Sequence, residues 1–414
     1  MTATPSQVPA QSTAQPGSAP QANAAVPPTA ASSIATTLGA LLERKLHKPV
    51  LLAAGGTGGH LFPAEAVADH LQAQGHDTIL VTDQRAVVRP NSPFRRPKGG
   101  VLVLGSHGVA GKGVLGKVRG VTSLLKATLQ ARAIVRRLQP ICCVGFGGYP
   151  SVPPLLSTQL LPPFWRPPVI IHEANAVLGK ANRMLARFAQ LGATSFPEVA
   201  GLPVDAHVVE TGMPVRPAIE ALLDVPYVAP TPDGPLNLLV WGGSLGAKAL
   251  TETVPLALAK LPPALRARLR VVQQIAPDAQ PKAREVYAKA GIKAELHPFI
   301  HDVPGQLRQA HLVVGRAGGS SVAELALAGR PSLMVPLPVA ASDEQTANAK
   351  AMMAVGAGWM MPQREMTPDH LAKTLEGLLS QPDTLAEAAR RAHSFAKPHA
   401  ARRLADLALA AERS

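Results

Sequence analysis

The chain has 414 residues, of which 46% are hydrophobic, so it is long and apolar enough for two domains with separate cores. Its 41 Lys and Arg residues against 27 Asp and Glu residues give a formal net charge of +14, which favours an anionic partner: nucleic acid, an anionic membrane surface or a phosphorylated substrate. Aromatic residues make up only 3%, too few to stack unpaired bases, so we expect no nucleic-acid partner.

The first segment, residues 1–45, is predicted to be a disordered tail rich in Ala, Pro and Gln. Residues 1–33 carry no charge and few large apolar side chains, so they cannot build a core. No basic region precedes an apolar segment of the kind found in signal peptides. No uncharged apolar run reaches the roughly 20 residues that span a bilayer. We therefore expect a soluble or peripheral protein.

A glycine-rich loop at residues 55–60 follows the apolar run 50–54 and precedes a helix-like stretch at 62–71. The apolar run is typical of a buried parallel strand, and Pro63 suits the first turn of a helix. Glycines let a ligand approach the backbone, and the start of a helix offers unpaired N–H groups. The loop therefore predicts a site for phosphate or a polar sugar, with a tight turn that binds nothing as the alternative.

Asp83 follows a second predicted strand at 78–82, and an acid in this place binds ribose in dinucleotide-binding proteins. The third glycine of that fingerprint would fall on Leu61, which weakens the dinucleotide interpretation.

Residues 94–138 mix basic and apolar side chains. An ordinary solvated helix face accounts for many of these charges. A basic rim around exposed apolar residues would instead bind anionic lipid, and both interpretations stay open.

Two further predicted strands, 141–145 and 169–173, each lead into polar residues. Cys142 and Cys143 lie within the first of them, show no metal-binding spacing and are predicted to be buried thiols of a reducing compartment. The carboxyl ends of parallel strands line one crevice. The polar side chains expected to converge there are His60, Tyr149, His172, Glu173 and Asn175.

The architecture restarts after a proline-rich connection at 226–235. Strands are predicted at 236–240, 271–274 and 312–315, and glycine loops follow the first and the last of them. Glycines and serines at 315–321 suit a pyrophosphate, and Glu324 can accept hydrogen bonds from two ribose hydroxyls. The alternative for Glu324 is a carboxylate that only favours the start of a helix. Residues 343–348 offer partners for sugar hydroxyls.

Six segments occur in the order and spacing of one bacterial family: GGTGGHLFPAEAVADHL, GFGGYPSVP, HEANAVLGKANRMLA, TGMPVRP, GGSLGA and GRAGGSSVAELALAGRP. From about residue 48 to the C-terminus the chain resembles the MurG family, the UDP-N-acetylglucosamine:lipid I N-acetylglucosaminyltransferases. The resemblance implies an α/β GT-B fold, with two Rossmann-like doubly wound domains facing a cleft. We expect an N-terminal acceptor and membrane-facing domain at 46–217, a linker at 218–235 and a C-terminal UDP-GlcNAc-binding domain at 236–414, whose last helix packs back on the first domain.

The resemblance also implies the reaction and its setting. GlcNAc moves from UDP-GlcNAc, with inversion, to the MurNAc 4-hydroxyl of lipid I (undecaprenyl-pyrophosphoryl-MurNAc-pentapeptide), giving lipid II for peptidoglycan synthesis. The family works at the cytoplasmic side of the cell inner membrane, on an anionic surface and near other cell-wall synthesis proteins. The donor loops are accompanied by no paired carboxylates with metal-ligand spacing, so we expect no cofactor and no protein-bound metal.

Matching positions imply the site residues. Expected donor contacts are Thr57, Gly58, Gly59, Asn175, Arg216, Ser244, Ile300 (through its backbone), Gly319, Ser320, Ser321, Val322, Ala323, Glu324 and Gln345. Tyr149 and His172 are expected on the acceptor side. His60 and Glu173 are both candidates for the catalytic base, His60 being the first choice because an imidazole titrates near neutrality. Residues that depart from the usual family pattern are Ala174, Met213, Leu245 and Glu344.

Three other functions compete with this interpretation. A related GT-B transferase with another lipid acceptor, such as diacylglycerol, would keep the donor loops. A dinucleotide oxidoreductase would explain Asp83 but not the second glycine-rich half. A non-catalytic scaffold would explain only the basic surface.

Overall fold

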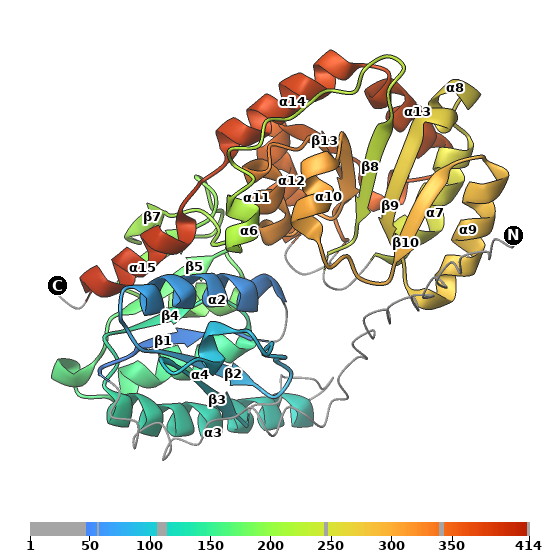
Figure 1. The fold of residues 1–414 in the computed structure, drawn as a ribbon. Coiled ribbons are helices and arrows are strands. Elements are labelled where there is room, and N and C mark those ends of the chain that lie inside the picture. The colour runs from blue at the N-terminus through green and yellow to red at the C-terminus, as the bar shows by residue number, and fades with distance from the viewer. Residues whose placement is uncertain (1–46, 56–57, 106–113, 244–246, 339–342, 412–414) are drawn as a thin grey trace, which may run out of the picture.

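The computed structural model describes residues 47–55, 58–105, 114–243, 247–338 and 343–411, which form two α/β domains, one above the other in Figure 1. The predicted tail, Thr57, Ser244 and Leu245 lie outside the described residues. Each domain is built on its own parallel sheet, so the expected pair of doubly wound domains is confirmed.

The N-terminal domain contains seven parallel strands in the order β3-β2-β1-β4-β5-β6-β7. The strands are β1 (Val50–Ala53), β2 (Thr78–Asp83), β3 (Gly99–Leu104), β4 (Cys142–Gly145), β5 (Val169–Glu173), β6 (Leu191–Thr194) and β7 (Val208–Glu210). The α-helices among them are α2 (Gly58–Ala73), α3 (Val114–Leu138), α4 (Val152–Ser157) and α5 (Lys180–Leu185). Short 3-10 turns cover Pro93–Arg95, Tyr149–Ser151, Thr158–Leu160 and Pro163–Trp165.

The C-terminal domain contains six parallel strands in the order β10-β9-β8-β11-β12-β13. The strands are β8 (Leu236–Trp241), β9 (Leu269–Gln274), β10 (Lys293–His297), β11 (Leu312–Gly315), β12 (Ser332–Met334) and β13 (Gly358–Met360). The helices from the end of β7 onward are α6 (Pro217–Glu220), α7 (Lys248–Ala259), α8 (Pro263–Arg268), α9 (Gln280–Lys289), α10 (Val303–Gln309), α11 (Gly319–Leu327), α12 (Glu344–Ala354), α13 (Pro368–Leu379), α14 (Pro382–Phe395) and α15 (Ala400–Ala410), with 3-10 turns at Pro277–Ala279 and Gln363–Glu365.

Both sheets reverse their strand order at one point, between β1 and β4 and between β8 and β11. In an open parallel sheet, ligands bind in the crevice outside the carboxyl ends of the strands at such a point. The two glycine loops that follow β1 and β8 begin there, so the topology brings both of them to binding positions.

The core follows from the alternation of side chains along buried strands. Val50 and Leu52 of β1 belong to one cluster, and Leu51 and Ala53 belong to the cluster on the opposite face of the sheet. The chain's last helix, α15, adds Leu404, Ala405 and Ala408 to the first of these clusters. In Figure 1 this helix (red) lies beside α2 (blue), so the chain returns to the N-terminal domain at its end.

Two details of the sequence interpretation were wrong. Helix α2 begins at Gly58 rather than near Phe62, so Pro63 is inside the helix and not in its first turn. Its ring nitrogen has no hydrogen, so the Gly59 carbonyl loses its usual intrahelical partner beside the glycine loop. The segment 94–138 also contains β3, whose side chains at Val101 and Leu102 are buried.

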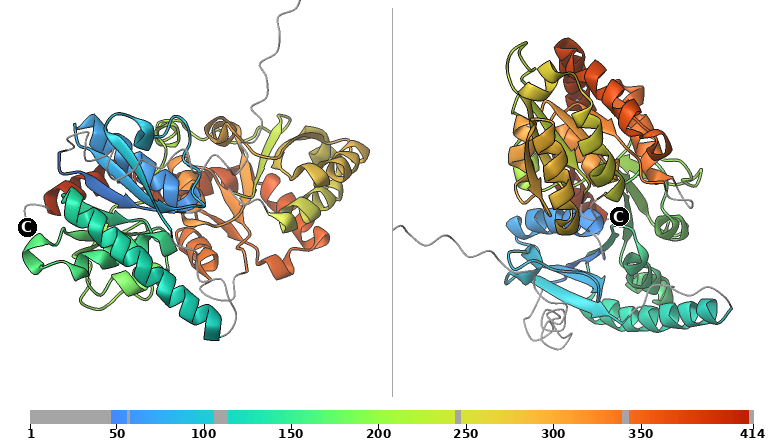
Figure 2. Two further views of the ribbon diagram at one scale, coloured as in Figure 1. Left: turned by 90° about the horizontal axis from the view of Figure 1, so that it is seen from below. Right: turned by 90° about the vertical axis from the view of Figure 1, so that its right-hand side faces the viewer.

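Helix α3 lies along the outside of the N-terminal domain, on the side away from the C-terminal domain (Figure 2, right, teal). Among the described residues, no helix combines the length and the apolar composition needed to cross a membrane.

Candidate active site

His60 is the third residue of α2, and its imidazole ring packs against the loop that follows β4. A Cβ added to either Gly147 or Gly148 would lie 3.4 Å from a carbon of that ring, and both glycines have a positive φ that other residues rarely adopt. Nδ1 is buried and has no hydrogen-bond partner among the described residues. Burial lowers the pKa of His60, so the ring is neutral at pH 7 and can accept a proton.

Two cavities meet at His60. The first, of about 450 Å³, lies in the N-terminal domain beneath the loops that follow β4 and β5, with Tyr149 in its wall. The second, of about 250 Å³, lies between the domains and is bounded by the glycines at the start of α11. His60, Asn175 and Glu344 border both cavities. Groups held in the two cavities can therefore approach one another beside these residues.

Glu173 borders the first cavity, but its carboxylate is already saturated with hydrogen bonds. Oε1 accepts from the backbone N–H and Nδ2 of Asn175, at 3.0 and 3.1 Å. Oε2 accepts from the backbone N–H of Gly179 and from Nδ2 of Asn182, both at 2.9 Å. Burial raises the pKa of Glu173, and these four N–H groups oppose that rise. With about four lone-pair positions filled, the geometry favours His60 over Glu173 as a proton acceptor.

The first turn of α11 offers unpaired N–H groups to the second cavity. Gly319, Ser320 and Ser321 are its first three residues and border that cavity. The N–H of Val322 already donates to the Gly318 carbonyl at 2.9 Å, and the Val322 side chain is buried in the core. The structure therefore supports phosphate contacts from three of these residues but not from Val322.

Other residues expected to contact the donor have side chains that are already hydrogen-bonded or buried in the core. Oε1 of Gln345 accepts from the backbone N–H groups of Ala317 and Leu337, so only its amide hydrogens remain for a ligand. The side chain of Ile300 is buried in the core, so a contact through its backbone is what the structure leaves. Ala323 packs on the same core cluster. Of the residues that depart from the family pattern, Ala174 and Glu344 border the second cavity.

Arg216 and Glu324 form an ion pair at 3.5 Å, outside the walls of both cavities. Burial raises the pKa of Glu324 to about 7, and the nearby Arg216 guanidinium opposes that shift. Oε2 of Glu324 is enclosed without a hydrogen-bond partner among the described residues. The guanidinium also lies 5.6 Å from the ring centre of Phe62 on α2, so Arg216, directly before α6, contacts both α2 and α11.

His172 does not reach either cavity, contrary to the acceptor contact expected for it. The side chain is buried, with Nε2 lying 3.1 Å from the Gly212 carbonyl and 3.3 Å from Oγ of Ser195. Burial lowers its pKa to about 4, so the ring is neutral and Nε2–H donates to that carbonyl. Met213 is buried in the same place. His172 therefore holds the loop at Gly212 and Met213 by a hydrogen bond and does not contact either cavity.

Asp83, the basis of the dinucleotide interpretation, is held by a neighbour in the chain. Its carboxylate is buried and forms an ion pair with Arg85 at 2.6 Å. The structure thus provides a local partner for this acid and does not support a ribose contact.

Sequence reasoning assigned no role to two polar residues of the site, Arg316 and Asn182, and it offered Asn348 only as a partner for sugar hydroxyls, without its contacts to Asn175 and Ala176. Arg316 borders the second cavity, and its guanidinium donates to the carbonyls of Val335 and Pro336. The position of Arg316, directly after β11 and before a glycine loop, is a signal that could have identified it. No local signal identifies Asn348, whose partners are far away in the sequence.

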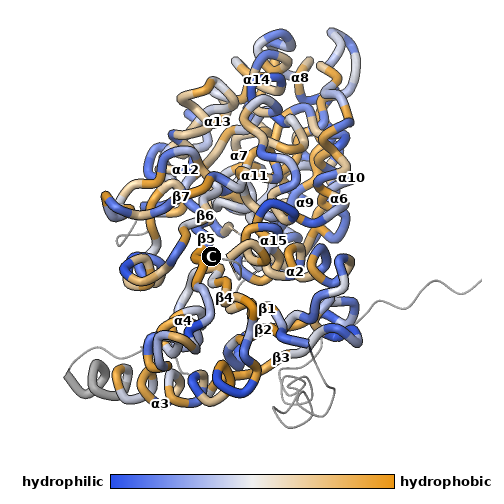
Figure 3. Tube along the Cα trace, turned by 90° about the vertical axis from the view of Figure 1, so that its left-hand side faces the viewer, coloured by the Kyte–Doolittle hydropathy of each residue, from blue (hydrophilic) through white to orange (hydrophobic). Residues whose placement is uncertain are grey.

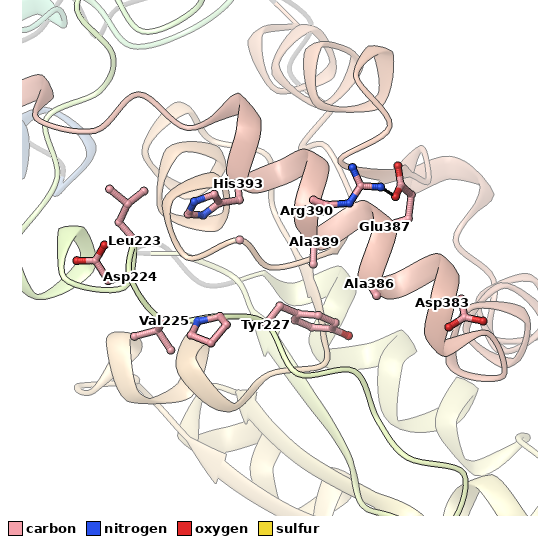
Figure 4. Close-up of a pocket in the computed structure, with 12 residues that line it drawn as sticks. Leu223, Asp224, Val225, Tyr227, Asp383, Ala386, Glu387, Ala389, Arg390 and His393 are labelled. Carbon is pink, nitrogen blue, oxygen red and sulfur yellow. Dashed lines mark ion pairs between the residues drawn. The ribbon is translucent and has the colours of Figure 1, made fainter.

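A further cavity, of about 610 Å³, lies between the linker and α14 and contains none of these residues. Figure 4 shows Tyr227 on one wall and His393 and the Glu387–Arg390 ion pair on the other. It is separate from the site at His60.

Comparisons with known proteins agree with this architecture. The glycosyltransferase family 28 N-terminal domain matches residues 50–193, and the glycosyltransferase family 28 C-terminal domain matches residues 237–404. The crystal structure of MurG from Acinetobacter baumannii superposes with a TM-score of 0.69 at 34% identity, covering 87% of this chain and 99% of that one. A calicheamicin glycosyltransferase, at 17% identity and a TM-score of 0.59, shares the fold.

Curated relatives carry one name, UDP-N-acetylglucosamine–N-acetylmuramyl-(pentapeptide) pyrophosphoryl-undecaprenol N-acetylglucosamine transferase. The protein from Gluconobacter oxydans is 53% identical over 370 residues, which cover 89% of this chain and 100% of the relative. The protein from Rhodospirillum centenum is 51% identical, covering 88% of this chain and 94% of the relative. The GT-B fold expected from the sequence is confirmed, and the chain belongs to the MurG family of glycosyltransferases.

Proposed function

We propose that this protein transfers GlcNAc from UDP-GlcNAc to the MurNAc 4-hydroxyl of lipid I, giving lipid II for peptidoglycan synthesis. The observation that carries the proposal is the pair of cavities that meet at His60, one in the N-terminal domain and one at the start of α11. The names and coverage of the curated relatives support the same donor and acceptor.

The reaction is a single displacement with inversion. The acceptor oxygen attacks C1 of GlcNAc, the bond from C1 to the phosphate oxygen breaks, and UDP leaves with the bonding electrons. His60 takes the proton of the attacking hydroxyl, a role supported by its neutral ring and by its place between the cavities. Glu173 then holds the loop at 175–182 through its four hydrogen bonds.

Charge develops on the leaving diphosphate as the bond breaks. The N–H groups of Gly319, Ser320 and Ser321 and the positive end of α11 stabilise that charge more in the transition state than in the ground state. Gly58 and Gly59 are the first two residues of α2, and their N–H groups are proposed to contact the donor phosphates in the same way as those at the start of α11. Arg216 and Glu324 hold the diphosphate and the ribose, Gln345 contacts the GlcNAc hydroxyls, and Tyr149 contacts the acceptor. Thr57 and Ser244 stay predictions from the sequence.

The outer face of α3 is the proposed membrane contact. Val121, Leu125 and Leu129 follow one another at intervals of four and are 65%, 57% and 51% exposed, so they form one apolar stripe along the helix. Leu160, Phe164 and Trp165 are also exposed, and the side chain of Arg132 donates to the Leu160 carbonyl, which joins them to the helix. These six apolar residues are called the α3 patch below.

The surroundings of the α3 patch suit an anionic surface. Lys126, Arg136 and Arg137 are exposed on the same helix, and Figure 3 shows hydrophobic and hydrophilic segments alternating along α3. Leu124 of the same helix borders the first cavity, so a membrane on this face would bring a lipid-linked acceptor to the site. The proposed location is the cytoplasmic side of the cell inner membrane, as the resemblance to the MurG family implies, with other cell-wall synthesis proteins as proposed partners.

The double variant Leu125→Glu/Leu129→Glu is expected to lose binding to vesicles that contain phosphatidylglycerol. Burying one leucine contributes about 1.5–3 kcal/mol, so losing two weakens binding at least tenfold, about 1.4 kcal/mol. Vesicle co-sedimentation measures this. The matched control, Val228→Glu/Leu256→Glu, adds the same charge at two exposed residues elsewhere and should bind normally. Equal vesicle binding by both double variants would exclude the α3 patch as the membrane contact.

The proposed function is tested by transfer of labelled GlcNAc from UDP-GlcNAc to a short-chain lipid I analogue. The expected product carries one β-linked GlcNAc on MurNAc. If UDP-GlcNAc binds but no transfer occurs, the acceptor is wrong, and if neither occurs, the proposed function is wrong.

A further inference from the structure

Asn348, on α12 of the C-terminal domain, is fully buried and connects the two domains. Its Oδ1 accepts from the backbone N–H of Ala176 at 2.8 Å. Its Nδ2 donates to Oδ1 of Asn175 at 3.0 Å and to the Ala317 carbonyl at 2.9 Å. The first two partners belong to the N-terminal domain and the third to the C-terminal domain. We call this set of three hydrogen bonds the Asn348 bridge.

Asn175 is held from its other side as well. Its Nδ2 donates to Oε1 of Glu173 at 3.1 Å, while its Oδ1 accepts from Asn348. Both polar groups of this side chain therefore have protein partners, although a donor contact was expected for it. Hydrogen bonds run without a break from Glu173 of the first cavity, through Asn175 and Asn348, to Ala317 of the donor loop.

The donor loop meets the N-terminal domain beside the bridge. Ala317 precedes Gly318, the residue that caps α11, and Gly319 begins that helix. A Cβ added to Gly319 would lie 2.0 Å from the Ala174 carbonyl oxygen, so the two backbones are in direct contact. The bridge thus fixes one domain against the other at the point where the two cavities meet.

We propose that Asn348 is a positioning residue that sets the register between the acceptor loop at 173–176 and the donor helix α11. This inference rests on the proposed function, in which each domain holds one reactant. Misplacing reacting groups by about 1 Å can lower a rate by about 10²-fold. Neither Asn348 nor its partners Ala176 and Ala317 are among the groups proposed to hold the diphosphate, so removing the bridge should change the chemical step and leave UDP affinity nearly unchanged.

The variant Asn348→Ala is expected to lower kcat for GlcNAc transfer by about 10²-fold, with UDP affinity by calorimetry unchanged. The Ala176 amide, which loses its acceptor, should exchange with solvent faster than in the wild type, a readout that does not depend on activity. The control Asn237→Ala removes one amide hydrogen bond, to the Gln309 carbonyl, within the C-terminal domain, and all three readouts should stay as in the wild type. Wild-type kcat in Asn348→Ala would overturn the proposal.

A second pair of variants separates positioning from folding. Asn348→Asp has nearly the same shape, but it places a carboxylate oxygen against the Ala317 carbonyl and Oδ1 of Asn175, so kcat should again fall with UDP affinity unchanged. The double variant Asn175→Ala/Asn348→Ala should be no worse than the more impaired single variant, because both break one connection.

Besides wild-type kcat in Asn348→Ala, three results would overturn the inference. The first is a fall in kcat in Asn175→Ala/Asn348→Ala that equals the product of the two single-variant losses. The second is a fall in UDP affinity and thermal stability that accompanies the fall in kcat in Asn348→Asp. The third is a wild-type exchange rate of the Ala176 amide in Asn348→Ala. If the wild-type protein showed no transfer activity, the proposed function would be wrong, and the positioning role, which rests on it, would be wrong as well.

Discussion

Replacing His60 by alanine is expected to lower kcat for GlcNAc transfer by about 10²- to 10⁴-fold, the usual contribution of a general base. UDP affinity should change little, because the groups proposed to hold the diphosphate are the N–H groups at the start of α11, Arg216 and the glycines at the start of α2, and none of them is the His60 side chain. The imidazole borders both cavities and is fixed by its packing against Gly147 and Gly148. Single-turnover transfer to the lipid I analogue measures the chemical step directly.

The pH dependence of kcat tests the same assignment. A base works only when it is unprotonated, and burial lowers the pKa of His60 below its ordinary value of 6.5. We therefore expect the acid limb of kcat to lie at lower pH than an ordinary histidine would give, and to be absent in His60→Ala. The exposed His207 provides the control, since His207→Ala should leave the profile unchanged.

Glu173→Gln distinguishes the two candidate bases. An amide nitrogen in place of one carboxylate oxygen would face N–H donors of Asn175 or of Gly179 and Asn182, so the loop should shift and kcat should fall. The acid limb of the profile should remain, because His60 is still present. If the limb disappears in Glu173→Gln and persists in His60→Ala, Glu173 is the base.

The strands next to the site were predictable, because short apolar runs bounded by glycine are typical of buried parallel strands. Those that begin at Val50, Thr78, Val169 and Leu236 were found in this way. Strand β3 was missed since it begins with Gly99 and Gly100 and lies among basic residues. The start of α2 was missed because Gly58 and Gly59 are poor helix formers, and Pro63 suggested a later start.

The site was only partly predictable, for reasons of geometry. Adjacent residues of a strand point to opposite faces, so His172 and Glu173 could not both enter one cavity. That alternation was available in the sequence and would have placed one of them in the core. The contact between Asn175 and Asn348 was not available, because 173 positions separate the two residues and both sit in polar segments typical of loops and helix starts.

Glu324→Gln is expected to raise stability and weaken donor binding in the same protein. Burial raises the pKa of Glu324 from 4.5 to about 7. The folded protein then holds a proton that the unfolded chain releases between these values, so stability falls as pH rises through this window. Above pH 7, the free energy of unfolding is lower than at pH 4.5 by on the order of 3 kcal/mol, at 1.36 kcal/mol per pKa unit. A neutral glutamine avoids this loss, so melting temperature without ligand should rise at pH 8 and change little at pH 4.5.

The UDP affinity of Glu324→Gln should fall, whereas its stability rises. An ionised carboxylate can accept hydrogen bonds from both ribose hydroxyls, and a hydrogen bond to a charged group contributes about 1.5–3 kcal/mol. Glutamine offers one acceptor oxygen and no charge, so UDP affinity at pH 8 should fall at least tenfold by calorimetry, about 1.4 kcal/mol. For the same reason, wild-type affinity should decrease as pH falls below 7, whereas the affinity of the variant should not. A variant that binds UDP normally, or that is less stable at pH 8, would contradict the assignment. The opposite signs of the two effects identify a buried carboxylate that lowers fold stability and strengthens donor binding.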